Sequence, residues 1–206
     1  MSRSRLPDAF AASGVFLACW GLVHTWFWSR GQLVDWPVYR DYGRAIVDHG
    51  LVPYRDFAVE YPPGALPVFA LPALLTPDGG FPAYAAAFEC LMALCGAALA
   101  AGVAYVLVRR GASRRRLVEA LALVGLATLA LGPVVVSRFD LWPAALTAAA
   151  VAALLAGRYR LALGVLGVAI AAKIYPAVLL GPAVVYVWRR AGRREALLAG
   201  SILAAV

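Results

Sequence analysis

Residues 161–188, LALGVLGVAIAAKIYPAVLLGPAVVYVW, form an apolar run that contains the only lysine of the chain, Lys173. A membrane-spanning helix needs about 20 apolar residues, so this run is longer than one span requires. Basic sequences flank it, GRYR before and WRRAGRR after. Near its middle, Pro176 disfavours helix at Tyr175 and breaks the backbone hydrogen-bond ladder. We therefore predict a broken helical hairpin with both ends on one side of a membrane and its turn at residues 173–176.

The composition supports an all-α membrane protein. Of the 206 residues, 63% are hydrophobic and 15% charged, whereas soluble chains carry about 25% charged residues. The basic residues behind the net charge of +8 lie at the ends of apolar blocks, which is typical of topology signals and argues against a nucleic-acid partner. The three cysteines lie within apolar blocks, so we predict no disulfide, no metal site and no other cofactor.

Several apolar blocks follow one another along residues 1–206. They predict a polytopic helical bundle that forms a single transmembrane domain. A polar loop covers residues 30–62, and the segment 64–75 is too short for a span, which predicts a re-entrant or interfacial helix. The last apolar block is incomplete at residue 206, so we expect an amino-terminal fragment. The predicted spans are residues 10–29, 82–108, 117–136 and 142–156, the hairpin 161–188, and a segment that starts at 196.

The positive-inside rule orients this bundle. The amino terminus and the loops RRGASRRR, GRYR and WRRAGRR together hold thirteen arginines. The loops 30–62 and SRFDLWP hold five arginines and six carboxylates. The first group is therefore predicted to be cytoplasmic and the second external. The alanine- and arginine-rich composition favours the plasma membrane of a bacterium.

The external loop carries an amphipathic pattern at residues 38–49, which predicts a helix lying on the membrane surface. Asp35 precedes it, and two interpretations are open: an N-cap of that helix, or a general base at the membrane surface. Asp41 has the pattern of a solvated position. Glu60 and Tyr61 stand at a rigid junction before two prolines.

Further charges are expected on the same side of the membrane. Arg138 and Asp140 fit either a surface ion pair or part of a site, and Lys173 would face a cavity at the tip of the hairpin. Inside the spans, Glu89 is expected to face the bundle and His24 to be a packing residue. Such a face suits a substrate with a phosphate, an apolar tail and a hydroxyl-rich head.

Four motifs occur in order: DWPVYRDYG, GLVPYRDFAVEYPPG, SRFDLWPA and AAKIYP. From Asp35 to about Arg190, the chain resembles integral-membrane glycosyltransferases of the GT-C fold, and most closely glycosyltransferase family 87. That family includes polyprenyl-phosphate-mannose-dependent mannosyltransferases and DUF2029 proteins. The chain is also similar to the mannosyltransferase of GPI-anchor assembly. Those relatives have a second Asp two residues before the position of Asp35, where this chain has Leu33, so a metal-binding Asp pair is not expected.

The resemblance implies transfer of a sugar, usually mannose, from a polyprenyl-phosphate donor to a lipid or cell-envelope glycan acceptor on the external face. It implies that Asp35 is the catalytic residue. The assignment of Lys173 to the donor phosphate is an inference from charge and depth. The positions expected to line the substrate site are Asp41, Glu60, Tyr61, Arg138, Asp140, Lys173 and Tyr175.

Two other classes of function are compatible with the sequence. A lipid or solute transporter or flippase also uses broken helices and intramembrane charges, but the charges here gather at one face and no inverted repeat is visible. A non-catalytic membrane fragment would bind lipid or a partner only. Substitution of Asp35 discriminates the enzyme from both, because only the enzyme needs that carboxylate for transfer.

Overall fold

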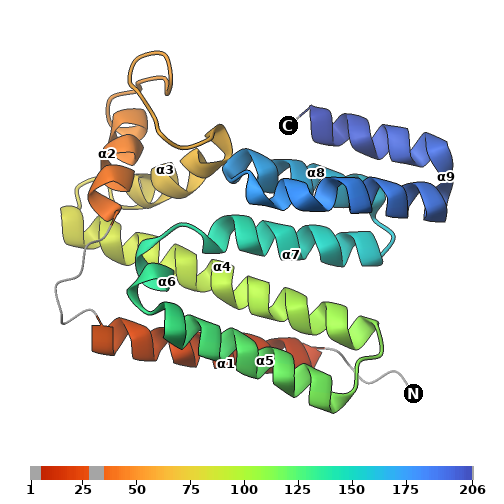
Figure 1. Ribbon diagram of the computed structural model, residues 1–206. Coiled ribbons are helices and arrows are strands. Elements are labelled where there is room, and N and C mark those ends of the chain that lie inside the picture. Colours follow the sequence, from red (N-terminus) through yellow and green to blue (C-terminus); the bar gives the residue numbers. More distant parts are fainter. Residues whose placement is uncertain (1–5, 28–34, 206) are drawn as a thin grey trace.

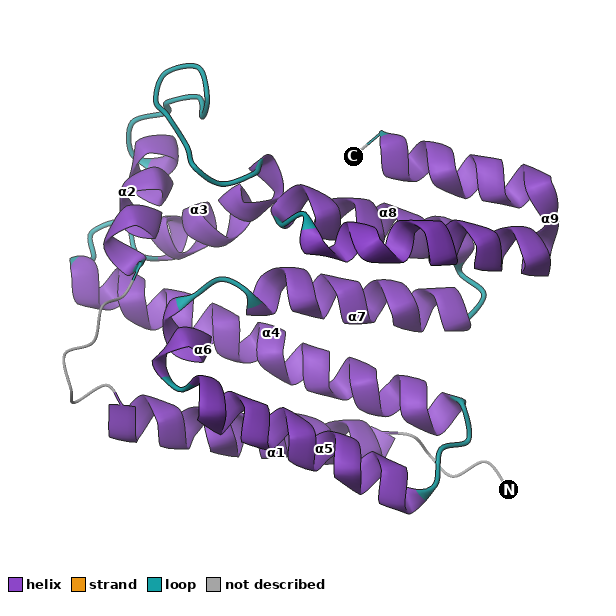
Figure 2. Cartoon of the chain, viewed as in Figure 1, coloured by secondary structure: helices purple, strands orange, loops and turns teal. Residues whose placement is uncertain are grey.

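The computed structural model describes residues 6–27 and 35–205, and within them the chain is helical, as predicted (Figures 1 and 2). The described residues contain no named β-strand, only an isolated bridge between Pro53 and Phe57. Two short 3-10 helices, η2 (Pro63–Ala65) and η3 (Tyr175–Leu179), interrupt the α-helices. The α-helices are α1 (Leu6–Phe27), α2 (Trp36–Val47), α3 (Leu66–Leu75), α4 (Phe81–Arg109), α5 (Arg114–Leu131), α6 (Pro133–Ser137), α7 (Leu141–Leu155), α8 (Tyr159–Ala172) and α9 (Leu180–Ala204).

The long helices lie side by side in layers. Helices α1 and α5 pack on α4, α7 packs on the other side of α4, and α8 joins α7 to α9 (Figure 1). Helices α2 and α3 pack against each other at the end of the bundle where α4 begins (Figure 1). This arrangement leaves the bundle with two distinct ends: one carries α2, α3 and α6, and the other carries the α4–α5 and α7–α8 turns.

Helix α4 is the central element of the bundle. Its 29 residues make it the one helix in the described parts of the chain that is both long and apolar enough to cross a membrane. Aromatic side chains at its beginning, including Tyr84 and Phe88, are fully buried against α2 and α3. The expected span at residues 82–108 corresponds to this helix.

The segment expected as one span at residues 117–136 is instead two helices. Helix α5 ends at Leu131, because Gly132 has a φ of 53°, a conformation that favours glycine. Pro133 follows, lacks a backbone N–H and begins the short helix α6. The resulting corner carries Arg138 and Asp140 to the end of the bundle near α2.

Helices α8 and α9 form a hairpin that is interrupted beside Pro176. Helix α8 ends at Ala172, and Lys173 has an extended backbone with φ −159° and ψ 139°. The chain then passes through η3 into α9, which contains a second break at Gly192 (φ 84°). Helix α9 therefore consists of two arms that fold back on each other (Figure 1), and the segment expected to start at residue 196 belongs to the second arm.

Helix α2 begins at Trp36, two residues before the predicted surface helix, and is fastened to the α3–α4 linker. The guanidinium of Arg44 donates hydrogen bonds of 3.0 Å to the carbonyl oxygens of Pro77 and Gly79. The same side chain pairs with Asp48 at 3.1 Å. These contacts position α2 and, with it, the residue that precedes the helix, Asp35.

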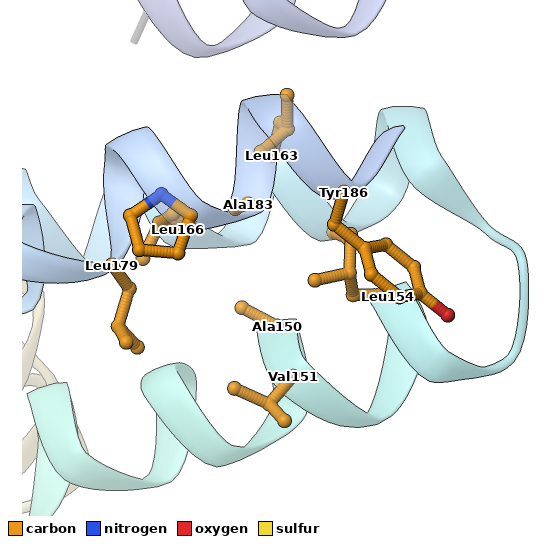
Figure 3. A pocket seen from close by; sticks show the side chains of 10 residues that line it. Ala150, Val151, Leu154, Leu163, Leu166, Leu179, Ala183 and Tyr186 are labelled. Atoms are coloured by element: carbon orange, nitrogen blue, oxygen red, sulfur yellow. The ribbon is translucent and has the colours of Figure 1, made fainter. Parts of the chain in front are cut away.

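An apolar cavity of about 200 Å³ lies between α7, α8 and α9 (Figure 3). Figure 3 shows aliphatic side chains of these helices facing one another across it, among them Val151 and Leu166. Because its lining is almost entirely apolar, we interpret this cavity as a gap in the packing of the helices and not as a site for chemistry.

Candidate active site

Asp35 lies at the centre of a polar cluster at the α2 end of the bundle. Its Oδ2 atom is 2.9 Å from Nε of Arg138 in an ion pair. The hydroxyl of Tyr39, one helical turn further on, donates a hydrogen bond of 3.2 Å to the same oxygen. The Asp35 side chain is 29% exposed, so a second reactant can still reach the carboxylate.

The structure distinguishes the two interpretations of Asp35 that the sequence leaves open. Asp35 occupies the N-cap position of α2, but its side chain makes no capping hydrogen bond. Its backbone is helical, with φ −85° and ψ 0°, whereas an N-cap residue that caps with its side chain usually has extended dihedrals. The carboxylate is therefore directed to Arg138 and Tyr39 and does not cap the helix.

A second ion pair, between Lys173 and Asp140, lies beside Phe139. The Nζ atom of Lys173 hydrogen-bonds to Oδ1 of Asp140, and it lies 5.3 Å from the centre of the Phe139 ring. Arg138 and Asp140, which flank Phe139 in the sequence, thus connect Asp35, at the start of α2, to the tip of the α8–α9 hairpin. Both lysine and aspartate side chains are about 40–50% exposed.

Four aromatic rings form the floor beneath these charges, and every pair among them is in contact. The centroids of the stacked pair, Tyr39 and Phe69, are 4.4 Å apart, and the other five pairs are 5.3 to 5.8 Å apart. Three of the rings are buried and Tyr61 is half-buried. Such a packed floor holds the polar groups above it in fixed positions. The four residues are Tyr39, Tyr61, Phe69 and Phe139.

The phenols of the floor remain protonated. Burial, the largest cause, raises the pKa of Tyr39, and the neighbouring Tyr61 and the charge of Asp35 raise it further. Burial also raises the pKa of Tyr61. Neither phenol is a base near neutral pH, so the groups above the floor that can accept a proton are the carboxylates of Asp35 and Asp140.

Backbone contacts bring the hairpin tip to the site. The indole Nε1–H of Trp142 donates a hydrogen bond of 3.0 Å to the carbonyl of Gly64. Gly64 lies so close to α8 that a Cβ atom there would be 2.5 Å from backbone atoms of Ala171 and Ala172. The 3-10 helix η2 therefore covers the end of α8 and holds Lys173 near Asp140.

Not every predicted site residue joins this cluster. Asp41 is exposed on another face of α2, and Glu60 is exposed in the loop; in the described parts of the chain, neither makes a hydrogen bond or an ion pair with the others. Tyr61 belongs to the floor, and Tyr175 lies near Asp140 at the hairpin tip. The described residues contain no group of three or more His, Cys, Asp or Glu side chains that could hold a metal ion.

Two features of this end of the bundle went unrecognised in the sequence. Tyr39 is four residues after Asp35, a spacing that places both on one helix face, and this signal was available. His24 is more than a packing residue: its Nδ1 atom is 3.2 Å from Oε2 of Glu89, and its ring stacks on Trp20 with centroids 5.3 Å apart. Glu89 is buried and faces the bundle, as expected.

These observations describe a helical protein with two carboxylates, two cations and an aromatic floor gathered at one end of the bundle. The family model of glycosyltransferase family 87 matches residues 59–206. The chain belongs to this family and is a glycosyltransferase. Searches of curated proteins and of solved structures found no match. The matched range includes Arg138, Asp140 and Lys173, whereas Asp35 lies before it.

Proposed function

We propose that this glycosyltransferase moves a sugar, mannose in the first instance, from a polyprenyl-phosphate donor to a hydroxyl of a lipid or cell-envelope glycan acceptor. The observation that carries the proposal is the cluster that joins Asp35, Arg138, Asp140 and Lys173 over one aromatic floor. It offers a base for a hydroxyl, Asp35, and a cation for a phosphate, Lys173, within one site.

Asp35 acts as the general base in this proposal. The acceptor oxygen attacks the anomeric carbon, the bond from that carbon to the phosphate oxygen breaks, and the phosphate leaves with the electron pair. Asp35 takes the proton of the attacking hydroxyl. Arg138 and Tyr39, which both contact Oδ2 of Asp35, hold the carboxylate in one orientation and leave Oδ1 to receive the proton.

Lys173 is assigned to the donor phosphate. Its side chain is 41% exposed and its ammonium is paired with Asp140 by a single contact, so the ammonium retains donors for a phosphate oxygen. Charge that develops on the leaving phosphate would be stabilised by this cation. Asp140 keeps the flexible lysine side chain at the site before the donor binds.

An apolar groove beside Lys173 fits the prenyl tail. The groove has a volume of about 380 Å³ and runs along α4 and α7. Tyr175, two residues after Lys173, lies at its lining together with Gly102 and Ala148. In this proposal the donor phosphate lies at Lys173 and the prenyl tail follows the groove from Tyr175.

We further propose that the bundle crosses the bacterial plasma membrane several times, with the Asp35 end external and the amino terminus cytoplasmic. The basic segments 109–116, 158–160 and 189–194 lie at the bundle end away from α2 and α6 (Figure 1). Large apolar side chains on the outside of the helices support contact with lipid; Leu94, Leu123 and Leu126 are 64–68% exposed.

The donor class is tested with membranes that contain the expressed chain. Radiolabelled polyprenyl-phosphate mannose and GDP-mannose are supplied in separate reactions, with the native lipids as acceptors. Transfer from the lipid-linked donor alone is expected. Transfer only from the nucleotide sugar would reject the donor class, whereas transbilayer movement of the labelled lipid without any transfer would favour a flippase.

A further inference from the structure

The bundle end opposite the candidate active site carries a second polar pocket. It has a volume of about 450 Å³ and lies between the last turns of α4 and α7 and the start of α8. Two guanidinium groups, those of Arg109 and Arg158, belong to its lining. The remaining lining residues are Tyr105, Ala149, Ala152, Ala153, Ala156 and Leu161.

Local structure places each arginine at this pocket. Arg109 is in the last turn of α4, and its Nη1 lies 3.3 Å from the hydroxyl of Tyr105. Arg158 follows a tight turn in which Gly157 has a φ of 79°, a conformation that favours glycine. The backbone N–H of Arg158 donates a hydrogen bond of 2.9 Å to the carbonyl of Ala153, which anchors this residue at the end of α7.

Some arginines at this bundle end are paired with a carboxylate, and others are not. Arg115 pairs with Glu119 at 2.7 Å, and Arg160 pairs with Glu195 at 2.9 Å. Among the described residues, no carboxylate forms an ion pair with Arg109 or Arg158. Two positive charges thus share one pocket without an anionic partner from the described protein, and an anionic ligand would relieve their repulsion.

We infer that this pocket binds the phosphodiester of an anionic phospholipid. The alanines of α7 form an apolar floor beside the guanidiniums, so an amphiphile is favoured over a free phosphate ion: its phosphate contacts the arginines and its acyl chain lies on the alanines. Basic pockets between membrane helices are typical sites for such head groups. The inference shares with the proposed function only the placement of the bundle in a membrane.

Native mass spectrometry of the purified chain in detergent tests this site. Dioleoyl phosphatidylglycerol and dioleoyl phosphatidylcholine are titrated separately onto the wild type, the pocket variant R109Q/R158Q and the control variant R114Q/R116Q. The control removes the same two charges from the same bundle end but outside the pocket. A hydrogen bond to a charged group contributes a factor of about ten or more, so loss of both phosphate contacts should lower the phosphatidylglycerol affinity of the pocket variant by about 100-fold. The control should lose less than about threefold.

Equal losses in the two variants, or equal binding of both lipids by the wild type, would overturn the inference, because either result means unspecific charge attraction or no head-group site. Displacement of bound phosphatidylglycerol by millimolar inorganic phosphate would also overturn it in favour of a free-anion site.

Should R109Q/R158Q not fold, as judged by gel filtration, R109K/R158K replaces it. Lysine keeps the charge but not the fork geometry, so that variant should retain part of the lipid binding, while full retention would exclude guanidinium recognition. Sugar transfer is not a readout, so this test is independent of the proposed function.

Discussion

The carboxylate of Asp35, which precedes α2, forms a 2.9 Å ion pair with the guanidinium of Arg138, which follows α6. The same carboxylate oxygen accepts a hydrogen bond from Tyr39. One oxygen therefore has two partners from the protein, which fixes the orientation of the group that we propose as the base. The ion pair links the start of α2 to the polar corner created by the break at Gly132.

Arg138→Gln should lower kcat for sugar transfer by about 10- to 100-fold. Without the ion pair to Arg138, the carboxylate of Asp35 spends less time in the reactive orientation. The donor KM should change by less than about threefold, since Arg138 acts on Asp35 in this account. Arg138→Lys should recover part of kcat. Steady-state kinetics on membranes with equal amounts of the variants provide the measurement, with Arg55→Gln, an exposed arginine paired with Asp56, as the matched control. An unchanged kcat in Arg138→Gln would contradict this role.

Lys173→Gln should act on donor binding instead. Loss of the ammonium removes a charge-assisted contact to the phosphate and should raise the donor KM about tenfold or more. Asp140→Asn leaves the cation in place and should keep the donor KM near or below that of the wild type. The same kinetic assay compares the two. If both substitutions raise the donor KM equally, the ion pair is structural and Lys173 does not hold the phosphate.

Gly64→Ala should destabilise the docking of η2 on the hairpin. The added Cβ would lie 2.5 Å from backbone atoms of Ala171 and Ala172, and overpacking of this kind costs about 1–3 kcal/mol. Gly181→Ala is the control, since a Cβ at that position meets no atom within 4 Å and alanine favours helix by about 1 kcal/mol. Thermal unfolding in detergent should shift down for the first and not for the second; equal shifts would mean that the close approach does not exist.

Stability should fall at alkaline pH because of Tyr39. Burial raises its pKa in the folded protein, whereas the unfolded phenol titrates near 10. The stabilising contribution of the protonated phenol is complete below about pH 10 and is lost as pH rises further, because only the unfolded chain releases the proton readily. Unfolding midpoints at pH 8 and pH 10.5 should therefore differ more for the wild type than for Tyr39→Phe. Equal differences would show that the phenol is not buried in the folded state.

Local signals in the sequence predicted the helices well. Pro176 marks the interruption between α8 and α9, and long apolar blocks correspond to α1, α4 and α7. The break at Gly132 was missed because a Gly-Pro pair inside an apolar block can also lie in a kinked helix. Helix boundaries at Trp36 and Leu131 depend on packing at the bundle end, which hydrophobic patterning does not encode.

The candidate site was predicted as a set of charges but not as a set of pairs. Arg138 and Asp140 are separated by one residue, yet they contact partners from different parts of the chain, Asp35 and Lys173. The burial of Phe139 in the aromatic floor places the two charges on either side of it, and this depends on tertiary packing. Asp41 lies within α2, six residues after Asp35, and is exposed on another face of that helix.

The most direct test of the account is sugar transfer by Asp35→Asn in membranes that hold equal amounts of inserted protein. Loss of a general base lowers transfer by about 10²- to 10⁴-fold, and that loss is the predicted result for labelled polyprenyl-phosphate mannose. Asp41→Asn, an exposed carboxylate outside the cluster, should transfer at nearly the wild-type rate. Wild-type transfer by Asp35→Asn, or an equal loss in Asp41→Asn, would contradict the assignment of Asp35 as the base.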